Sequence, residues 1–288
     1  MQHQIRFGPA GASDSFYAEG HKHSYEAPTW LKARGLDAFE YSFGHGVRMG
    51  EKAARALRQA AQEADIALSI HMPYFINLAA QDTEKREKNL AYFVESLEAA
   101  RCMGAKRAVF HPGSGKGQRD KVLEGACAFL KEILSVLDAQ HLLDGVTLCA
   151  ETMGKINQLG SLEEVIRLCQ VDDRLWPAVD FGHLHCRGLG AIQGREDYAR
   201  MLDALEDGLG MERARTMHIH FSRIEFSKGG EKMHHTFADI QYGPEFPPLA
   251  LELASRKYMP VVICESRGTQ AEDAAAMRRM YQAALGEK

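Results

Sequence analysis

Histidine and acidic residues stand where successive apolar segments of this chain end. Six such segments in a row end at or carry one of them, in the order His71, His111, Glu151, Asp180, His218 and Glu265. Imidazole nitrogens and carboxylate oxygens are ligands that zinc, manganese and iron accept in proteins. A single histidine at a strand end is usually a hydrogen-bonded structural residue, but six consecutive segments with this ending favour a metal centre.

This set of residues is larger than one ion requires. His183 follows Asp180 by three residues, and His234 lies in the loop after the segment of His218. A carboxylate such as Glu151 can bridge two ions, and two ions roughly 3.5–4 Å apart can clamp the attacking and leaving oxygens of a phosphoryl displacement. We therefore predict a centre with more than one ion, in which His185, His220 and His235 have supporting or structural roles.

Eight short, β-rich apolar segments must position these side chains. Each is separated from the next by enough residues for a helix, and residues 83–103 and 122–137 show helical periodicity. Strand and helix repeated eight times predict parallel strands joined by crossovers, and eight such units close into a (β/α)₈ TIM barrel. We expect one domain over residues 1–288, with a doubly wound open sheet as the alternative. The expected strands are 5–8, 38–41, 67–71, 107–111, 146–151, 177–180, 216–220 and 261–265.

Composition excludes several classes of protein. The 288 residues are 45% hydrophobic and 26% charged, which is ordinary for a globular chain. No apolar run approaches the ~18 residues of a membrane helix. The net charge of −4 weighs against a nucleic-acid binder unless bound divalent ions offset the deficit. Six cysteines without a Cys-x-x-Cys pair exclude zinc-ribbon and thioredoxin-like sites and predict a reduced, cytoplasmic protein.

At its candidate ligands the chain resembles the endonuclease IV family, the trinuclear-zinc apurinic/apyrimidinic endonucleases (family 2) of the xylose isomerase-like TIM-barrel superfamily. The matching segments stand in the family's order and spacing, from the third expected strand to the eighth. They include His71-Met-Pro-Tyr-Phe-Ile-Asn-Leu-Ala79, Phe110-His-Pro-Gly-Ser114 and Val179-Asp-Phe-Gly-His183, and also residues 151–160, 217–218 and 264–265.

The resemblance implies a ligand set and a reaction. Zinc would occupy two or three sites, with manganese as the alternative metal. Hydroxide bound to the metal would hydrolyse the DNA backbone 5′ to abasic sites, as in base excision repair, with Glu151 and Glu265 as catalytic carboxylates. The first ion would be held by His71, His111 and Glu151, the second by Glu151, Asp180, His218 and Glu265, and the third by His183 and His234.

The resemblance also concerns the surface that would meet DNA. Tyr74 and Phe75 match an aromatic–apolar pair that enters the duplex at the lesion in the family, although the pair could instead cover the barrel mouth. Arg48 could replace the family's DNA-probing arginine. Lys232 stands where the family has an aspartate of the third site, so Glu231 substitutes there or the third site is weak or absent. The implied partner is double-stranded DNA with abasic sites, bound by a monomer without contact with a membrane.

Two other functions fit some of the same residues. A single-metal sugar isomerase or epimerase of the xylose isomerase-like superfamily would use Glu, Asp, His and Glu on strands five to eight, which Glu151, Asp180, His218 and Glu265 also satisfy. His71 and His111 separate the two readings, because a one-metal enzyme has less use for them as ligands. The third alternative is a non-catalytic protein that binds a metal or another ligand.

Overall fold

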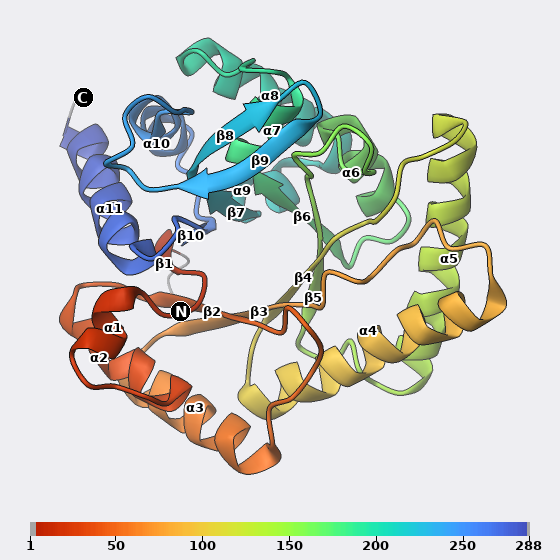
Figure 1. The fold of residues 1–288 in the computed structure, drawn as a ribbon, viewed down its shortest axis with the longest axis horizontal. Helices are drawn as coiled ribbons and strands as arrows, with labels where there is room; N and C mark the ends of the chain where they lie inside the picture. Colours follow the sequence, from red (N-terminus) through yellow and green to blue (C-terminus); the bar gives the residue numbers. More distant parts are fainter. Residues whose placement is uncertain (1–3, 287–288) are drawn as a thin grey trace.

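The computed structural model describes residues 4–286, and its central feature is a sheet of eight parallel strands surrounded by helices (Figure 1). The strand order is β1-β10-β7-β6-β5-β4-β3-β2, and the bridge between Ala10 and Glu40 brings the two edge strands together. The predicted (β/α)₈ barrel is thereby confirmed. Its strands are β1 (Arg6–Pro9), β2 (Ala38–Ser42), β3 (Ala67–His71), β4 (Arg107–Phe110), β5 (Thr147–Glu151), β6 (Leu175–Asp180), β7 (His218–Phe221) and β10 (Val261–Cys264).

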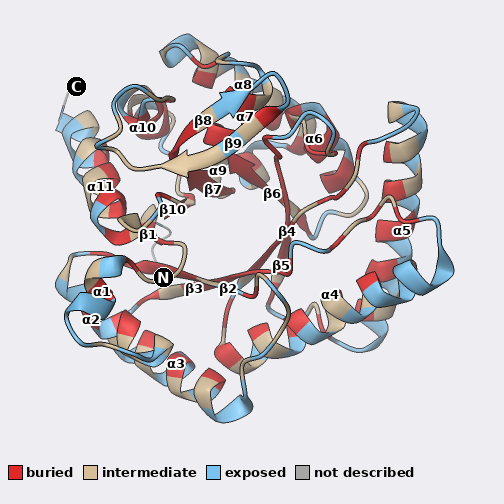
Figure 2. Ribbon diagram, viewed as in Figure 1, coloured by how far each residue is buried: buried red, intermediate tan, exposed pale blue. Residues whose placement is uncertain are grey.

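The helices lie outside the barrel and turn their apolar faces inward (Figures 1 and 2). The two helices expected from periodicity are α4 (Thr83–Met103) and α5 (Arg119–Ala139). α4 begins where the Asp82 carboxylate accepts from the amide of Lys85, and it ends at Gly104, whose φ of 72° favours glycine. The others are α1 (Asp14–Ala18), α2 (Ala27–Ala33), α3 (Glu51–Ala64), α6 (Leu162–Cys169), α7 (Phe181–Arg187), α8 (Arg195–Leu209), α9 (Met211–Arg215), α10 (Phe246–Ser255), α11 (Gln270–Gly286) and a 3₁₀ turn, η1 (Ser24–Glu26).

Burial of these helical faces against the sheet holds the barrel together. In α5 the buried residues recur every three or four positions, which makes one continuous apolar stripe. Each fully buried leucine or phenylalanine contributes roughly 1.5–3 kcal/mol relative to an exposed one. Within residues 4–286, none of the helices has the length and hydropathy needed to cross a bilayer.

A β-hairpin follows β7, where the sequence was interpreted as a loop. Its strands β8 (Arg223–Ser227) and β9 (Gly230–His235) pair antiparallel over the barrel mouth. Two backbone hydrogen bonds join the hairpin to the loop after β5. The amide of Glu231 donates to the carbonyl of Gly154 (3.1 Å), and the amide of Ile156 donates to the carbonyl of Gly229 (3.1 Å). This segment therefore reaches the mouth as a defined two-stranded element.

Tight packing between the first two strands gives a stability prediction. A Cβ atom on Gly8 would lie 1.8 Å from the backbone oxygen of Ala38. We expect Gly8→Ala to lower the free energy of unfolding by at least about 2 kcal/mol in urea titrations, since overpacking typically costs 1–3 kcal/mol. Gly125→Ala is the control, because that Cβ would meet only Gln81 at 4.0 Å inside α5 and should stabilise by up to about 1 kcal/mol. Equal stability of the two variants would contradict this account.

Candidate metal centre

The carboxyl ends of the strands surround a cavity of about 690 Å³. In a barrel these ends point to one mouth, so residues far apart in sequence meet there. The predicted ligands His71, His111, Glu151, His183, His234 and Glu265 all line this cavity, together with Glu231. Four groups of donor atoms could hold an ion among the described residues: three of them contain these side chains, and the fourth contains Glu40, His218 and His220.

The first group contains His71, His111 and Glu151. Two imidazole nitrogens approach Oε2 of Glu151: Nε2 of His71 at 3.1 Å and Nε2 of His111 at 3.0 Å. Nδ1 of His71 donates to the backbone carbonyl of Met72 (2.8 Å), which fixes the ring and leaves Nε2 directed at the carboxylate. A ligand histidine whose other nitrogen is held in this way is the common arrangement at metal sites.

The second group joins Glu151, Asp180, His220 and Glu265. Nδ1 of His220 lies 3.0 Å from Oε1 of Glu151 and 3.4 Å from Oε1 of Glu265. Oδ1 of Asp180 accepts from the amide of His183 (2.7 Å) and so caps α7. Its Oδ2 is buried and has no hydrogen-bond partner among the described residues. An unpaired buried carboxylate oxygen is costly without a cation, so this group fits a metal ion.

The third group contains His183, His234 and Glu265, with Glu231 beside them. Nδ1 of His183 donates to the carbonyl of Thr152 (2.9 Å), and Nε2 faces Oε2 of Glu231 at 3.5 Å. Nε2 of His234 lies 3.9 Å from the other oxygen of Glu231. Glu231 is thus a second carboxylate, besides Glu265, that faces both histidines.

A β-bulge in β9 explains why Glu231 rather than Lys232 faces this group. Glu225 pairs with Met233, whereas the next residue, Phe226, pairs with Glu231, so Lys232 is the extra residue of the bulge. The ammonium group of Lys232 forms an ion pair with Glu225 on the neighbouring strand. The bulge breaks the alternation of the strand and brings residues 231 and 234, three apart, to the same group.

The structure places His220, rather than the predicted His218, beside Glu151 and Glu265. His218 lies two residues earlier on β7, about 6–7 Å back along the strand, and its donor atoms are grouped with Glu40 and His220 instead. A ligand role for His220 in the second group therefore replaces that of His218 as the proposal. Both side chains point inward because they are two residues apart on a strand, and sequence spacing alone does not separate them.

Glu40 is the residue that the sequence analysis missed. It lies on β2, is fully buried, and contacts both His218 and His220 at 2.9 Å. The available signal was a carboxylate in the otherwise uncharged strand Ala38–Ser42. His185 and His235 lie outside the three groups: His185 accepts from the amide of Ile192, and His235 stacks on Tyr242.

The charges of the groups are coupled. Burial would raise the pKa of Glu151, but the charges of His111 and His220 outweigh it and hold that pKa well below its usual range. Burial lowers the pKa of His71 and His183, and the neighbouring carboxylates more than compensate, raising both to about 9. Burial raises the pKa of Glu265. Concentrated negative charge in a desolvated place is an environment that attracts cations.

The residues predicted to meet DNA lie at different distances from this cavity. Tyr74, 45% exposed, lines it and places its hydroxyl 2.8 Å from Nε2 of His45. Phe75, 52% exposed, lines a neighbouring cavity of about 290 Å³ with Lys85 and Lys88. Arg48 is exposed in the loop between β2 and α3, outside the lining of the mouth cavity.

Comparison with known proteins establishes the family. Residues 28–283 match the model of the xylose isomerase-like TIM barrel family, and the chain belongs to this family. It is 32% identical over 261 residues to "Uncharacterized protein MJ0133" of Methanocaldococcus jannaschii, covering 90% of this chain and 91% of that protein.

Relatives named endonuclease 4 match a smaller part of the chain. That of Thermus thermophilus is 32% identical over 171 residues, 59% of this chain and 58% of its own length. A crystal structure of endonuclease IV from the same species superposes with a TM-score of 0.67 at 27% identity, over 98% of this chain and 100% of that one. A D-tagatose 3-epimerase-like protein has a TM-score of 0.72 at 17% identity, over 98% and 99% of the two chains, and shares the fold.

The two inward histidines of β7 provide a test of the ligand groups. We expect His220→Asn to lose the ion of the second group, because that ring faces Glu151 and Glu265. His218→Asn is the matched control on the same strand, and it should retain the full number of ions after dialysis against Zn²⁺. Elemental analysis of the folded variants gives the metal count per chain. Loss of an ion in His218→Asn but not in His220→Asn would restore the assignment made from the sequence.

Proposed function

We propose that this member of the xylose isomerase-like TIM barrel family is a metal-dependent phosphodiesterase that hydrolyses DNA 5′ to abasic sites with two or three zinc ions. The observation that carries the proposal is the division of one carboxylate between two ligand groups. Oε2 of Glu151 contacts His71 and His111, whereas Oε1 contacts His220. Adjacent ions that share Glu151 would suit phosphoryl transfer, because two ions can stabilise both the attacking and the leaving oxygen.

The residues of the chain would hold and shape this centre. Bound zinc ions would supply a water of lowered pKa and positive charge for the oxygens of a phosphodiester. The Glu151 side chain is 1% exposed and would bridge ions, while that of Glu265 is 18% exposed and faces the cavity and the substrate. Glu265 also belongs to the second and third groups, so it would hold two neighbouring ions at fixed separation.

Cationic side chains at the mouth support an anionic substrate. Lys155, Lys232 and Arg267 line the cavity together with the ligand groups. Their charges would meet backbone phosphates, which contribute much of the affinity of DNA-binding proteins. The exposed Tyr74 and Phe75 beside them could stack against an unpaired base or fill the space of a missing one. The similarity to proteins named endonuclease 4 supports the same substrate.

Sugar epimerisation is the second candidate. Glu151, Asp180, His220 and Glu265 by themselves suffice to hold one divalent ion. Under that reading His71 and His111 would bind substrate hydroxyls or hold Glu151. The two functions therefore differ in the number of ions that the active protein requires.

Cleavage of abasic DNA tests the proposed function. We expect the zinc-loaded protein to nick duplex DNA 5′ to a single tetrahydrofuran abasic analogue. Chelation and Glu265→Gln should each reduce the rate by at least about 10²-fold, because both remove transition-state stabilisation. Glu132→Gln, an exposed carboxylate on α5, should leave the rate unchanged.

The outcomes of this assay separate the alternatives. A protein that holds two or three ions yet leaves the DNA intact would refute the abasic substrate while keeping the metal centre. Full activity with one ion per chain would refute the bridged centre. Ketose epimerisation by the one-ion protein would establish the second candidate.

The exposed aromatic pair gives a further prediction. We expect Tyr74→Ala and Phe75→Ala each to weaken binding of the abasic duplex about 10-fold, because stacking on an aromatic ring is worth 1–3 kcal/mol per base. Fluorescence anisotropy with labelled duplex measures the change. Met211→Ala is the control, since Met211 is 55% exposed on α9, which precedes β7 and so lies at the opposite end of the barrel. Unchanged affinity in both aromatic variants would show that the pair only covers the mouth.

A further inference from the structure

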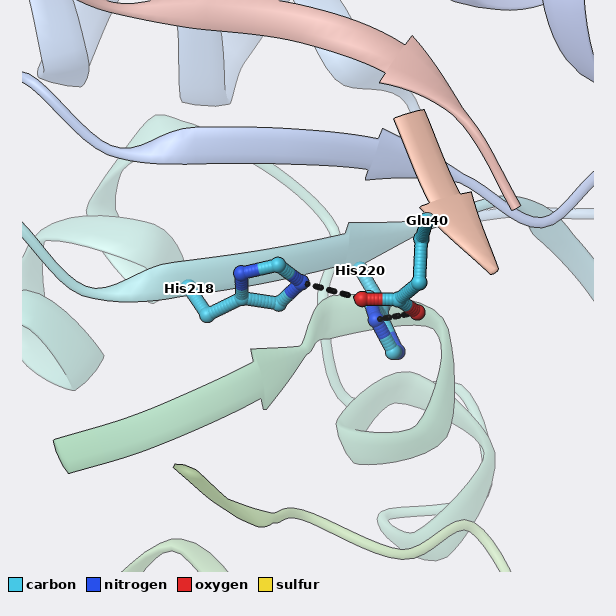
Figure 3. A group of neighbouring side chains, drawn as sticks. All are labelled: Glu40, His218 and His220. Atoms are coloured by element: carbon cyan, nitrogen blue, oxygen red, sulfur yellow. Dashed lines mark ion pairs between the residues drawn. The ribbon is translucent and has the colours of Figure 1, made fainter. Parts of the chain in front are cut away.

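Glu40 is a carboxylate at the centre of the barrel whose surroundings require an explanation. It is 0% exposed, and so are His218 and His220 on β7. Its Oε2 lies 2.9 Å from Nε2 of His218 and accepts from the hydroxyl of Ser69 (2.8 Å), and its Oε1 lies 2.9 Å from Nε2 of His220 (Figure 3). A buried carboxylate costs several kcal/mol unless a cation or hydrogen bonds compensate it.

His220 connects this carboxylate to the metal centre. Its Nε2 faces Glu40, whereas its Nδ1, on the opposite edge of the ring, faces Glu151 and Glu265. Oε1 of Glu40 and Nε2 of His220 lie 2.9 Å apart, although neither atom makes a hydrogen bond among the described residues. A proton on Nε2 leaves the lone pair of Nδ1 directed at the second ligand group.

We infer that Glu40 is a positioning residue that fixes the orientation of His220 and increases its basicity as a metal ligand. The inference rests on the proposed metal-dependent function. A carboxylate–histidine–metal series of this kind commonly raises metal affinity 10–100-fold. His71 and His183 are oriented by backbone carbonyls instead, so His220 is the ligand in these groups whose ring is held by a full negative charge.

A separate ion between Glu40, His218 and His220 is the alternative arrangement, since their donor atoms lie within 4.8 Å of one another. Each oxygen of Glu40 lies 2.9 Å from Nε2 of a different histidine, but neither Nε2 atom makes a hydrogen bond among the described residues. One ion shared by the three side chains would have to lie about 2.0–2.2 Å from every donor atom. Metal stoichiometry distinguishes the two arrangements.

Two variants of Glu40 test the inference. Glu40→Gln keeps the size of the side chain and one acceptor oxygen but removes its charge, and Glu40→Leu removes the charge and both acceptors. We expect both variants to bind the same number of Zn²⁺ ions as the unaltered protein. The affinity of the second group should fall about 10-fold with glutamine and about 100-fold with leucine. Competition with a chromophoric chelator gives the affinity, and the visible absorption of the Co²⁺-loaded protein reports the geometry around the ion.

Glu252→Gln is the matched control for a buried glutamate. Glu252 lies on α10, is 6% exposed, and pairs with Arg195 and Arg256, outside the ligand groups. Its replacement should lower the free energy of unfolding without changing Zn²⁺ affinity or the Co²⁺ spectrum. Urea titration of all the metal-free variants identifies any loss of folding, and Glu40→Gln alone decides the matter if the leucine variant does not fold.

Each outcome bears on a different claim. Unchanged Zn²⁺ affinity in a folded Glu40→Gln protein would overturn the positioning role while leaving the proposed function intact. Loss of one whole ion per chain in that variant would overturn it as well, because Glu40 would then be a ligand. Failure of the unaltered protein to bind any divalent ion would refute both the positioning role and the proposed function.

Discussion

Negative charge gathered at the centre of a desolvated barrel is the constraint on which the rest of the structure depends. Five carboxylates lie at or just below the mouth: Glu40, Glu151, Asp180, Glu231 and Glu265. Water screens them poorly, so each must face a cationic or hydrogen-bonding partner. The histidines on β3, β7, α7 and β9, and His111 directly after β4, supply those partners in the protein itself, and divalent ions would replace protons on them. The positions of these histidines follow from that requirement.

The parallel barrel satisfies this constraint because it brings the ends of all its strands to one place. Side chains at the ends of β3, β4, β5, β6 and β7 supply the ligand groups, and His71 and His220, 149 positions apart in the chain, have ring centres 5.9 Å apart. The outer helices bury apolar side chains against the sheet, while the carboxyl ends of the strands carry polar side chains that line the cavity. The β8–β9 hairpin adds what the strands alone do not provide, a carboxylate and an imidazole above α7.

Much of this arrangement could be predicted from the sequence, since a strand that ends in a histidine or an acid is visible as an apolar run followed by that residue. Each of the eight expected strands overlaps an observed one, and His71, Glu151 and Asp180 are the last residues of theirs. His218 and His220 were exchanged because residues two apart share a face, and only the pairing of β7 with β6 and β10 sets their depth. Which of Glu231 and Lys232 faces the third group depends on a β-bulge, and a bulge has no signature in a single sequence. The signal for Glu40 was one carboxylate in an otherwise uncharged strand. It was not sufficient, because sequence alone does not distinguish a single buried acid from an exposed one.

The shared carboxylates support the proposed centre of several ions over a single ion in the same barrel. If a single ion occupied the second group, Oε2 of Glu151 would keep two histidine neighbours, and Glu265 and Glu231 would face His183 and His234 with no ion between them. Such an enzyme would maintain four buried or half-buried imidazoles and a bulged hairpin solely to neutralise its own acids. Apolar residues in place of these acids and histidines would fill the barrel at lower cost in stability, because replacing buried ion pairs by apolar residues is often neutral or stabilising. Ions in adjacent groups would give every one of these side chains a ligand role, and the division of Glu151 between two groups would suit the proposed reaction on a phosphodiester.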